Sequence, residues 1–186
     1  KNYNKRQLNL AIGYDGRLEI VDSVKKIIRD IEKGLIKIPQ FQRDFVWDIE
    51  KSANLIDSII KGYPIGTFIF WKTKERLRSI RNIGGIVLPN PENGDFVNFV
   101  LDGQQRLTSL FASLRGAQIN QEHLTVDYSN IFINLEALDD EQIVVCDVQN
   151  LTEGQYIKLT DLIYGGLAHL SQYDLKYHTK LDEYKN

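Results

Sequence analysis

Two short segments of the sequence place glutamine and arginine side chains next to apolar stretches. In residues 38–47, Gln40, Gln42 and Arg43 alternate with large aromatic side chains just before an expected helix. An arginine guanidinium binds phosphate through a planar fork of N–H donors, and an aromatic ring can stack on a nucleobase. The segment therefore suits a nucleotide, but it also fits a strand edge with buried aromatics and Arg43 paired to a neighbouring aspartate. Taken alone, these residues favour the structural explanation slightly.

In the second segment, residues 100–108, a buried strand is expected to meet an Asp-Gly turn, after which a helix begins at once. The first backbone N–H groups of a helix have no partner within the helix and attract an anion. Gln104, Gln105 and Arg106 lie in that first turn. There the arginine would hold a phosphate and a glutamine would orient water, as in some NTP hydrolases. Asp102 would bind Mg²⁺ through a water molecule or act as a base. The ordinary alternative is a turn in which Asp102 caps the helix and the glutamines are solvated.

Other familiar catalytic signatures are absent from the sequence. It contains neither a GxxxxGK(S/T) phosphate loop, nor a GxGxxG turn, nor an HExxH zinc motif, and its three histidines lie apart from one another. Its single cysteine, Cys146, cannot form an internal disulfide, and its apolar neighbours predict a buried side chain. These observations give no support to P-loop, Rossmann or cysteine-based zinc sites and favour a cytoplasmic protein.

The charge of the chain is unevenly distributed, although its total is close to zero. The 186 residues carry 23 Lys+Arg and 25 Asp+Glu, a formal net charge of −2. Residues 1–81 hold 17 basic and 10 acidic side chains, a balance of +7, and residues 82–186 hold 6 and 15, a balance of −9. A basic half is a hint of nucleic-acid contact, whereas the ordinary explanation is that the halves fold together and their charges pair. The most basic run predicts a DNA contact through Lys72, Lys74, Arg76, Arg78 and Arg81.

The expected helices and strands do not alternate regularly, which favours an α+β fold. Apolar spacing predicts one helix from Asp22, taken as its N-cap, and a second helix between the cap Asp48 and Gly62. A third helix follows the Asp-Gly turn and closes at Gly116, and Thr160 is a candidate cap for a fourth. Strands are expected at 35–38, 67–71, 96–101, 130–135 and 143–147.

Three blocks of the sequence together resemble a known family. Residues 38–47, residues 55–66 and the Asp-Gly-Gln-Gln-Arg core of residues 101–108 are similar, in content and order, to the N-terminal domain of GmrSD-type, modification-dependent restriction endonucleases. That domain belongs to the ParB/sulfiredoxin-like superfamily. The similar blocks lie between about residues 22 and 116, and residues 117–186 contain no motif of that family. The resemblance implies a small mixed sheet flanked by helices, and an activity that binds and hydrolyses nucleoside triphosphates in bacterial defence against phage DNA.

The resemblance also assigns roles to individual residues. The DGQQR segment is tied to nucleotide use, and the pair Gln42 and Arg43 would complete the same pocket. It implies a nucleoside triphosphate, and from the residues themselves we expect Mg²⁺ as the accompanying metal, with Asp102 as its candidate ligand. Phe41 stands where the family often has tyrosine, and we expect Phe41 and Trp47 to be core residues rather than stacking platforms. The expected catalytic residues are Asp102, Gln104, Gln105 and Arg106, and the expected phosphate-binding residues are Gln40, Gln42, Arg43, Gly103, Arg106 and Thr108.

The expected organisation is one nucleotide-binding unit with short flanking segments. Residues 1–16 form a lead-in segment, residues 17–165 form the ParB-like NTP-binding domain, and residues 166–186 begin a truncated C-terminal helical region. The lack of any methionine indicates a fragment, and the lack of an HNH pattern fits a nuclease domain or subunit outside this chain. No apolar run approaches the roughly 18 residues of a membrane span, so no membrane contact is expected.

The expected partners are a nucleoside triphosphate and DNA, including modified phage DNA, and homodimerisation is left open. One rival interpretation is a non-enzymatic ParB-like module that binds DNA or docks a partner. A second rival makes the domain itself the nuclease, and the lack of clustered carboxylates argues against it.

Overall fold

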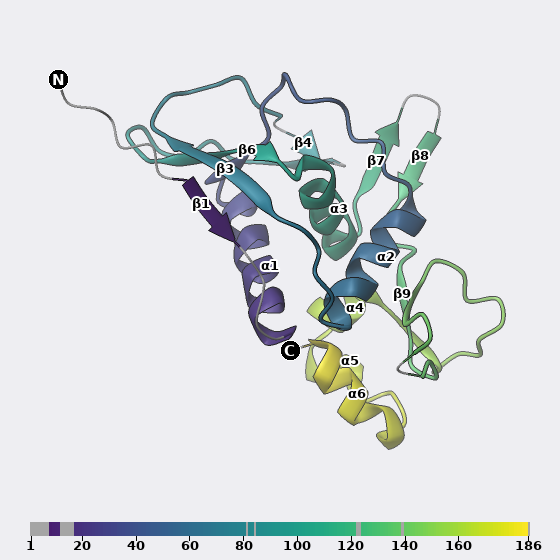
Figure 1. Cartoon of the computed structure of the whole chain (residues 1–186). Coiled ribbons are helices and arrows are strands. Elements are labelled where there is room, and N and C mark those ends of the chain that lie inside the picture. Colours follow the sequence, from purple (N-terminus) through teal and green to yellow (C-terminus); the bar gives the residue numbers. More distant parts are fainter. Residues whose placement is uncertain are drawn as a thin grey trace.

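The structure is a computed structural model that describes residues 8–11, 17–80, 82–83, 85–121, 124–138 and 140–185. A four-stranded sheet has the order β1 (Leu8–Ala11), β3 (Phe68–Thr73), β6 (Val97–Asp102) and β2 (Ile36–Lys37). Strand β3 is antiparallel to both of its neighbours and β2 runs parallel to β6, so the sheet is mixed. Figure 1 shows the sheet at one end of the molecule with helices beneath it. This mixture of helices and small sheets confirms the predicted α+β class.

Three helices, α1 (Arg17–Glu32), α2 (Ile49–Ile60) and α3 (Gln104–Arg115), pack on one another beside the sheet. Helix α2 begins as predicted, because the Asp48 carboxylate accepts a hydrogen bond of 2.7 Å from the N–H of Lys51, a free donor of the first turn. Helix α1 begins earlier than Asp22, so the prediction that Asp22 caps it is wrong. Residues 18–21 include good helix formers and no breaker, and the helix therefore continues through them.

The apolar core joins α3 to the sheet. Leu107, Leu110 and Phe111 of α3 are completely buried, and so is Val100 of β6. Fully buried apolar side chains at native packing density leave little freedom for the elements that carry them. The turn between β6 and α3 is therefore held on both of its sides by the core.

A second sheet of three strands, in the order β10 (Val144–Val145), β9 (Phe132–Asn134) and β11 (Tyr156–Lys158), packs against α2 through β10. Buried Asp57 of α2 makes this connection. Its Oδ1 accepts hydrogen bonds from the N–H groups of Ile143 at 2.7 Å and Val144 at 3.0 Å, and its Oδ2 pairs with Lys61 at 2.7 Å. Two hairpins are also present: β4 (Asn82–Ile83) with β5 (Ile86–Val87), and β7 (Gln118–Gln121) with β8 (Leu124–Asp127).

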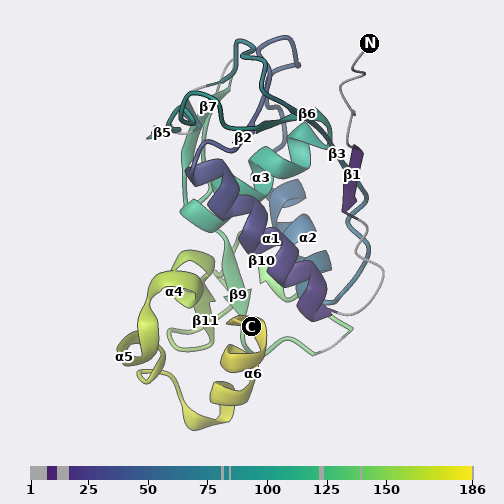
Figure 2. The ribbon, with the colours of Figure 1, turned by 90° about the vertical axis from the view of Figure 1, so that its left-hand side faces the viewer.

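The C-terminal segment packs onto the second sheet. Helices α4 (Leu159–Tyr164), α5 (Gly166–Leu170) and α6 (Leu175–Lys185) follow β11, and Figure 2 shows them gathered beside β9 and β11. Tyr177 and Leu181 of α6 are buried. The Lys180 ammonium donates hydrogen bonds to the carbonyls of Leu135 at 3.0 Å and Ala137 at 2.9 Å. Helix α6 thus shares a core with the residues before it.

The structure can be compared with two sequence expectations, the Thr160 helix cap and the flanking segments. Thr160 lies inside α4, which begins at Leu159 after an extended Lys158 with no side-chain cap, so the predicted Thr160 cap is wrong. Strand β1 falls within the expected lead-in 1–16 and α5 and α6 fall within 166–186, while the segment boundaries themselves stay predictions. Among the residues described above, no helix is long and apolar enough to cross a membrane.

Candidate functional site

The candidate site is built on the sharp turn between β6 and α3. Gly103 has a left-handed backbone with a φ of 89°, and a Cβ atom there would lie 2.7 Å from Cδ1 of Phe68. Any other residue would be both strained and crowded at this position. Helix α3 begins at Gln104, and no side chain caps its first turn. The alternative in which Asp102 caps the helix is therefore wrong, and the first N–H groups of α3 have no side-chain partner from a cap.

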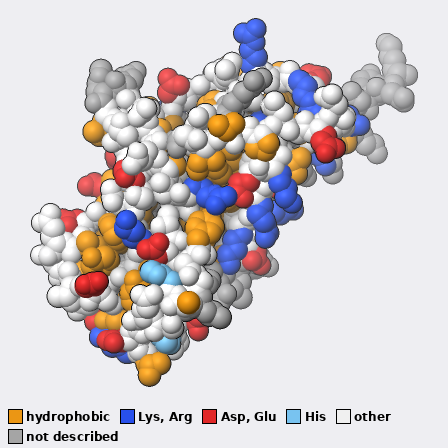
Figure 3. Space-filling view, turned by 180° about the vertical axis from the view of Figure 1, so that it is seen from behind, with side chains coloured by type: hydrophobic (Ala, Val, Ile, Leu, Met, Phe, Trp, Pro, Cys, Tyr) orange, Lys and Arg blue, Asp and Glu red, His pale blue; other side chains and the backbone are white. Residues whose placement is uncertain are grey.

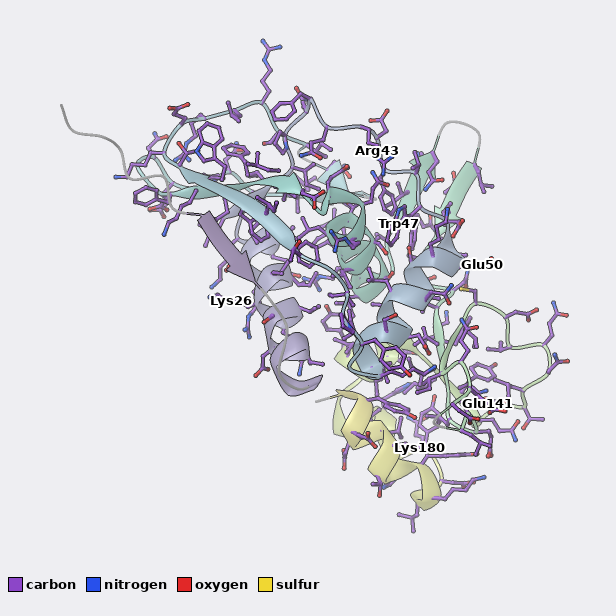
Figure 4. The ribbon with its side chains drawn as sticks, in the orientation of Figure 1. Lys26, Arg43, Trp47, Glu50, Glu141 and Lys180 are labelled. Atoms are coloured by element: carbon purple, nitrogen blue, oxygen red, sulfur yellow. The ribbon has the colours of Figure 1, made fainter. Side chains whose placement is uncertain are left out.

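Both glutamine–arginine segments line one polar pocket of about 200 Å³ at this helix start. Arg43 and Trp47 lie on the segment that leads into α2, as Figure 4 shows, and the other lining residues lie on the turn and the first turn of α3. Two segments far apart in the sequence thus meet, as expected if Gln42 and Arg43 complete the pocket of the DGQQR segment. The pocket is lined by Gln42, Arg43, Trp47, Asp102, Gly103, Gln104, Gln105 and Arg106.

Two glutamines tie these segments together. The Gln42 amide donates from Nε2 to the carbonyl of Val100 at 2.8 Å. Gln105 accepts from the N–H of Val46 at 3.0 Å and donates from Nε2 to the carbonyl of Asp44 at 2.9 Å. Its second Nε2 hydrogen goes to Oε1 of Gln104 at 3.0 Å, so both amide hydrogens of Gln105 are used. Gln105 is therefore a positioning residue for residues 44–46, and it is buried rather than solvated.

Arg106 holds a different loop. Its guanidinium donates from Nη1 to the carbonyl of Ile65 at 2.6 Å and from Nη2 to that of Thr67 at 2.8 Å. Between them, Gly66 has a φ of 82°, and a Cβ atom there would lie 2.1 Å from Nη1 of Arg106. Arg106 also lies 5.1 Å from the ring centroid of Phe68. Arg106 therefore fixes the loop that leads into β3, and two of its five N–H donors are already used.

Arg43 and Gln104 have side-chain N–H donors that form no hydrogen bond with the described residues. The Arg43 side chain is exposed and makes no hydrogen bond or ion pair with any part of the chain that the structure describes. The expected alternative of an Arg43 ion pair with Asp44 or Asp48 is therefore wrong, since Asp48 instead caps α2 and approaches Lys51 at 3.7 Å. A guanidinium with all five donors unsatisfied lines the pocket.

The amide of Gln104 is the second such group. Gln104 is only 4% exposed, its Oε1 accepts from Gln105, and its buried Nε2 has no partner. The orientation of this amide follows from its neighbours, because the Val46 N–H requires the oxygen of Gln105 and the Gln105 nitrogen then requires the oxygen of Gln104. A buried donor without a partner costs about 1–3 kcal/mol, which a bound acceptor would recover. The pocket therefore suits an anion.

Asp102 fits a magnesium ion only together with a ligand. Its carboxylate is 64% exposed, lines the pocket and lies 3.7 Å from the Arg106 guanidinium. Within the described residues no group of three or more His, Cys, Asp or Glu side chains is arranged to hold a metal. Mg²⁺ is usually bound through one or two carboxylates together with substrate phosphates and water. A single rim carboxylate beside a pocket that suits an anion fits that pattern.

Two expected phosphate ligands lie elsewhere. Gln40 lines a separate hollow and is not among the residues that line the α3 pocket. Thr108 is 4% exposed, lies one turn further along α3 and has a buried Oγ1 without a partner. Neither residue lines the α3 pocket.

The two aromatic residues of the first segment differ in burial. Trp47 is half-buried and packs against the core as expected. Phe41 is 73% exposed, so the expectation that Phe41 is a core residue is wrong.

The side chains of the basic run have different contacts. The Lys72 and Lys74 ammonium groups lie 5.1 and 4.9 Å from the Phe96 ring centroid, whereas Arg76 donates to the carbonyl of Glu92 at 2.7 Å. Arg78 lines the separate hollow, and Arg81 lies outside the described residues.

Helix α1 supplies a basic surface that the motif analysis did not single out. It exposes Lys26 and Arg29, Lys33 is exposed directly after its last residue, and Figure 3 shows Lys and Arg side chains gathered in a row on that side of the molecule.

Residues far from both motifs complete the site. The buried Tyr128 hydroxyl donates to the carbonyl of Trp47 at 2.6 Å, and the Gln121 amide donates to the same carbonyl at 2.8 Å. Burial raises the pKa of Tyr128 to about 12, because the phenolate would be poorly solvated there. No local pattern around either residue predicts this contact, since it depends on where the β7–β8 hairpin packs.

The family match covers most of the chain. Residues 24–184 match the family described as the GmrSD restriction endonuclease, N-terminal domain. The chain belongs to this family. The match confirms the resemblance drawn from the three sequence blocks and extends it beyond residue 116, into the segment that contains none of those motifs.

Curated relatives match shorter parts of the chain. An uncharacterized protein of Methanocaldococcus jannaschii, MJ0686, is 32% identical over 133 residues, covering 67% of this chain and 21% of that protein. A tritrans,polycis-undecaprenyl-diphosphate synthase of Sulfurisphaera tokodaii is 42% identical over 78 residues, covering 38% of this chain and 29% of the synthase. The corresponding synthase of Thermoplasma acidophilum is 50% identical over 44 residues, covering 24% and 17%. The chain therefore spans less than a third of each of these relatives. No solved structure matches it.

Proposed function

We propose that this chain is the nucleoside-triphosphate-binding, and NTP-hydrolysing, domain of a bacterial DNA restriction protein that acts against phage. One observation carries this proposal: the unpaired guanidinium of Arg43 and the orphaned Nε2 of Gln104 lie at the uncapped start of α3. A helix start with free N–H groups, an arginine fork and a buried amide donor is a chemically complete phosphate site. Family membership supplies the restriction context.

The size of the pocket limits how the nucleotide would bind. About 200 Å³ is less than the roughly 300–1,000 Å³ of pockets that enclose a whole small ligand. The phosphates would therefore enter the pocket, and the ribose and base would lie at its open side. This arrangement leaves the phosphates in contact with the residues whose donors are unused.

The roles that we propose for the motif residues differ from those that the family resemblance implies. Gln105 and Arg106 position the two surrounding loops through backbone carbonyls, so we assign them to the shape of the site. Arg43 and Gln104 would contact the phosphates. Asp102 would hold Mg²⁺ through water or accept the proton of the attacking water. The metal would neutralise charge on the phosphate oxygens during hydrolysis.

The wider assignment rests on the family. We propose that DNA is the target of the complete protein and that a nuclease domain or subunit outside this chain cleaves it. We also propose a ParB/sulfiredoxin-like fold, which the small mixed sheet with flanking helices supports. A non-enzymatic DNA-binding module remains the alternative, and it predicts no phosphate release.

Calorimetric titration with Mg²⁺-ATP and Mg²⁺-GTP tests the site. Arg43→Ala should weaken nucleotide binding by tenfold or more, whereas Lys26→Ala, an exposed charge on α1, should leave it unchanged. Asp102→Asn should reduce the release of inorganic phosphate while nucleotide binding without Mg²⁺ persists. Equal nucleotide affinity in wild type and Arg43→Ala would overturn the site, and nucleotide binding without phosphate release would overturn the hydrolase.

A further inference from the structure

A second and larger hollow also contacts residues 38–47, through Gln40, and shares no lining residue with the α3 pocket. Its volume is about 720 Å³, and it is bounded by residues 76–79, by residues 90–93 and by the strands β2 and β6. Its polar lining consists of three cations and of neutral side chains, and none of its lining residues is acidic. The cations and amides are Lys37, Arg76, Arg78, Gln40, Asn90 and Asn93. A hollow of this composition attracts an anionic ligand.

Two of the cations are held in place by the backbone. Lys37 is only 3% exposed, and its ammonium donates to the carbonyl of Pro89. Arg76 donates from Nη2 to the carbonyl of Glu92 at 2.7 Å and from Nη1 to that of Asp95 at 3.3 Å. These bonds use two of the five guanidinium donors and fix the plane of the group, so three donors are pre-positioned for a ligand.

Arg78 is available in a different way. Its side chain is exposed, and it makes no hydrogen bond or ion pair with the residues that the structure places. Its backbone carbonyl accepts from the N–H of Gln40 at 3.0 Å, which joins the 76–79 loop to the start of the 38–47 segment. The backbone of Arg78 is thus held in place, while its guanidinium has no partner among the described residues.

An aromatic ring adjoins this hollow in the chain. Phe41 follows Gln40, which lines the hollow, and precedes Gln42, which lines the α3 pocket. It lies in a turn closed by a hydrogen bond of 3.2 Å from the N–H of Gln42 to the carbonyl of Pro39, and it is 73% exposed. Exposed aromatic rings beside cationic grooves are the stacking platforms of single-stranded nucleic-acid binding.

We propose that this hollow and Phe41 bind a single strand of DNA. Arg76 and Arg78 would contact its phosphates, the amides of Gln40, Asn90 and Asn93 would contact sugar or base edges, and a base would stack on Phe41. The hollow, of about 720 Å³, has room for only part of a strand, and a base must be unpaired to stack on the exposed Phe41 ring, which favours a single strand over a duplex. This inference concerns a site separate from the α3 pocket and does not rest on nucleotide binding there.

Fluorescence anisotropy with a labelled thymidine oligonucleotide of about twelve nucleotides, and with the matching duplex, tests the proposal. Wild type should prefer the single strand, and its affinity should fall with salt. Phe41→Ala should bind on the order of tenfold more weakly. Arg78→Ala should lower the slope of log affinity against log salt by about 0.7, the value for one phosphate contact on a single strand. Neither side chain has a hydrogen-bond or ion-pair partner in the described chain, so both variants should fold normally.

Two control variants separate this site from the others. Arg43→Ala should retain wild-type DNA affinity, and Arg78→Ala should retain wild-type nucleotide affinity. The DNA-binding proposal and the nucleotide-binding proposal can therefore be refuted separately. Lys72→Ala, whose ammonium lies over the Phe96 ring outside the hollow, serves as the matched charge control. Unchanged DNA affinity in both Phe41→Ala and Arg78→Ala, or wild-type binding to duplex alone, would overturn the proposal.

Discussion

Replacing Arg106 should destabilise the fold more than it changes any contact with a ligand. The guanidinium joins α3 to the loop before β3 through hydrogen bonds of 2.6 and 2.8 Å to two carbonyls. The variant Arg106→Ala removes both bonds and leaves Ile65 and Thr67 without these donors. The matched variant Arg43→Ala removes an arginine from the same pocket that has no partner in the described chain.

The expected size of the effect follows from these contacts. A hydrogen bond to a charged group contributes about 1.5–3 kcal/mol, and both carbonyls lie near the surface, so the lower value applies to each. The contact of Arg106 with the Phe68 ring adds about 0.5 kcal/mol, and the 3.7 Å approach to the exposed Asp102 adds little. Arg106→Ala should therefore lower the free energy of unfolding by about 3.5 kcal/mol. Arg43→Ala should change it by less than about 0.5 kcal/mol.

Urea denaturation followed by tryptophan fluorescence measures the difference. With a urea dependence of about 2 kcal/mol per M, a loss of about 3.5 kcal/mol moves the midpoint down by about 1.8 M. Arg106→Lys keeps the charge but cannot bridge two carbonyls with a planar fork, so its midpoint should lie between those of wild type and Arg106→Ala. A wild-type midpoint for Arg106→Ala, or a larger loss for Arg43→Ala, would refute the assignment of Arg106 as a positioning residue.

Two further predictions concern residues that connect the site to the rest of the fold. Asp57→Ala should lower the melting temperature by about 10 °C, because two backbone N–H groups and Lys61 lose their buried partner, at about 1–3 kcal/mol for each unsatisfied group. Thermal unfolding with Asp57→Asn, which keeps an oxygen acceptor, should show a smaller loss, and equal melting of Asp57→Ala and wild type would contradict this role. Tyr128→Phe should cost about 1 kcal/mol at neutral pH through the lost bond to Trp47. The pKa of Tyr128 is raised on folding from an ordinary value near 10 to about 12, so its contribution is complete below pH 10 and is lost as pH rises toward 12. Urea midpoints of the two proteins should therefore converge over that range, and a constant difference up to pH 12 would contradict the assignment.

Local sequence signals predicted the elements that carry the candidate site. The Asp48 cap of α2 and the abrupt passage from β6 through Gly103 into α3 were both found from short patterns. Such signals act within a few residues, where capping and a positive φ are decided by backbone chemistry. The same kind of signal failed at Asp22 and Thr160, because a capping residue type also occurs inside helices when the preceding residues continue the helix.

The roles of the motif residues needed the tertiary structure. Sequence alone treated Arg43 and Arg106 as equivalent phosphate forks, since both follow glutamine beside apolar segments. Packing separates them, because the carbonyls of Ile65 and Thr67 come within hydrogen-bond distance of Arg106, whereas no group of the described residues does so for the Arg43 side chain. It likewise gives both amide hydrogens of Gln105 to partners and leaves Nε2 of Gln104 buried without one.

The sequence by itself determined the family, the α+β class and the two segments that line the candidate pocket. Those properties depend on residue types at fixed spacings along the chain. Only the tertiary structure decided that Arg43 and Gln104 have donors without partners among the described residues, and that Phe41 is exposed while its chain neighbours Gln40 and Gln42 line two different pockets. Those properties depend on which carbonyls and amides arrive from distant segments, and no spacing along the chain encodes that arrival.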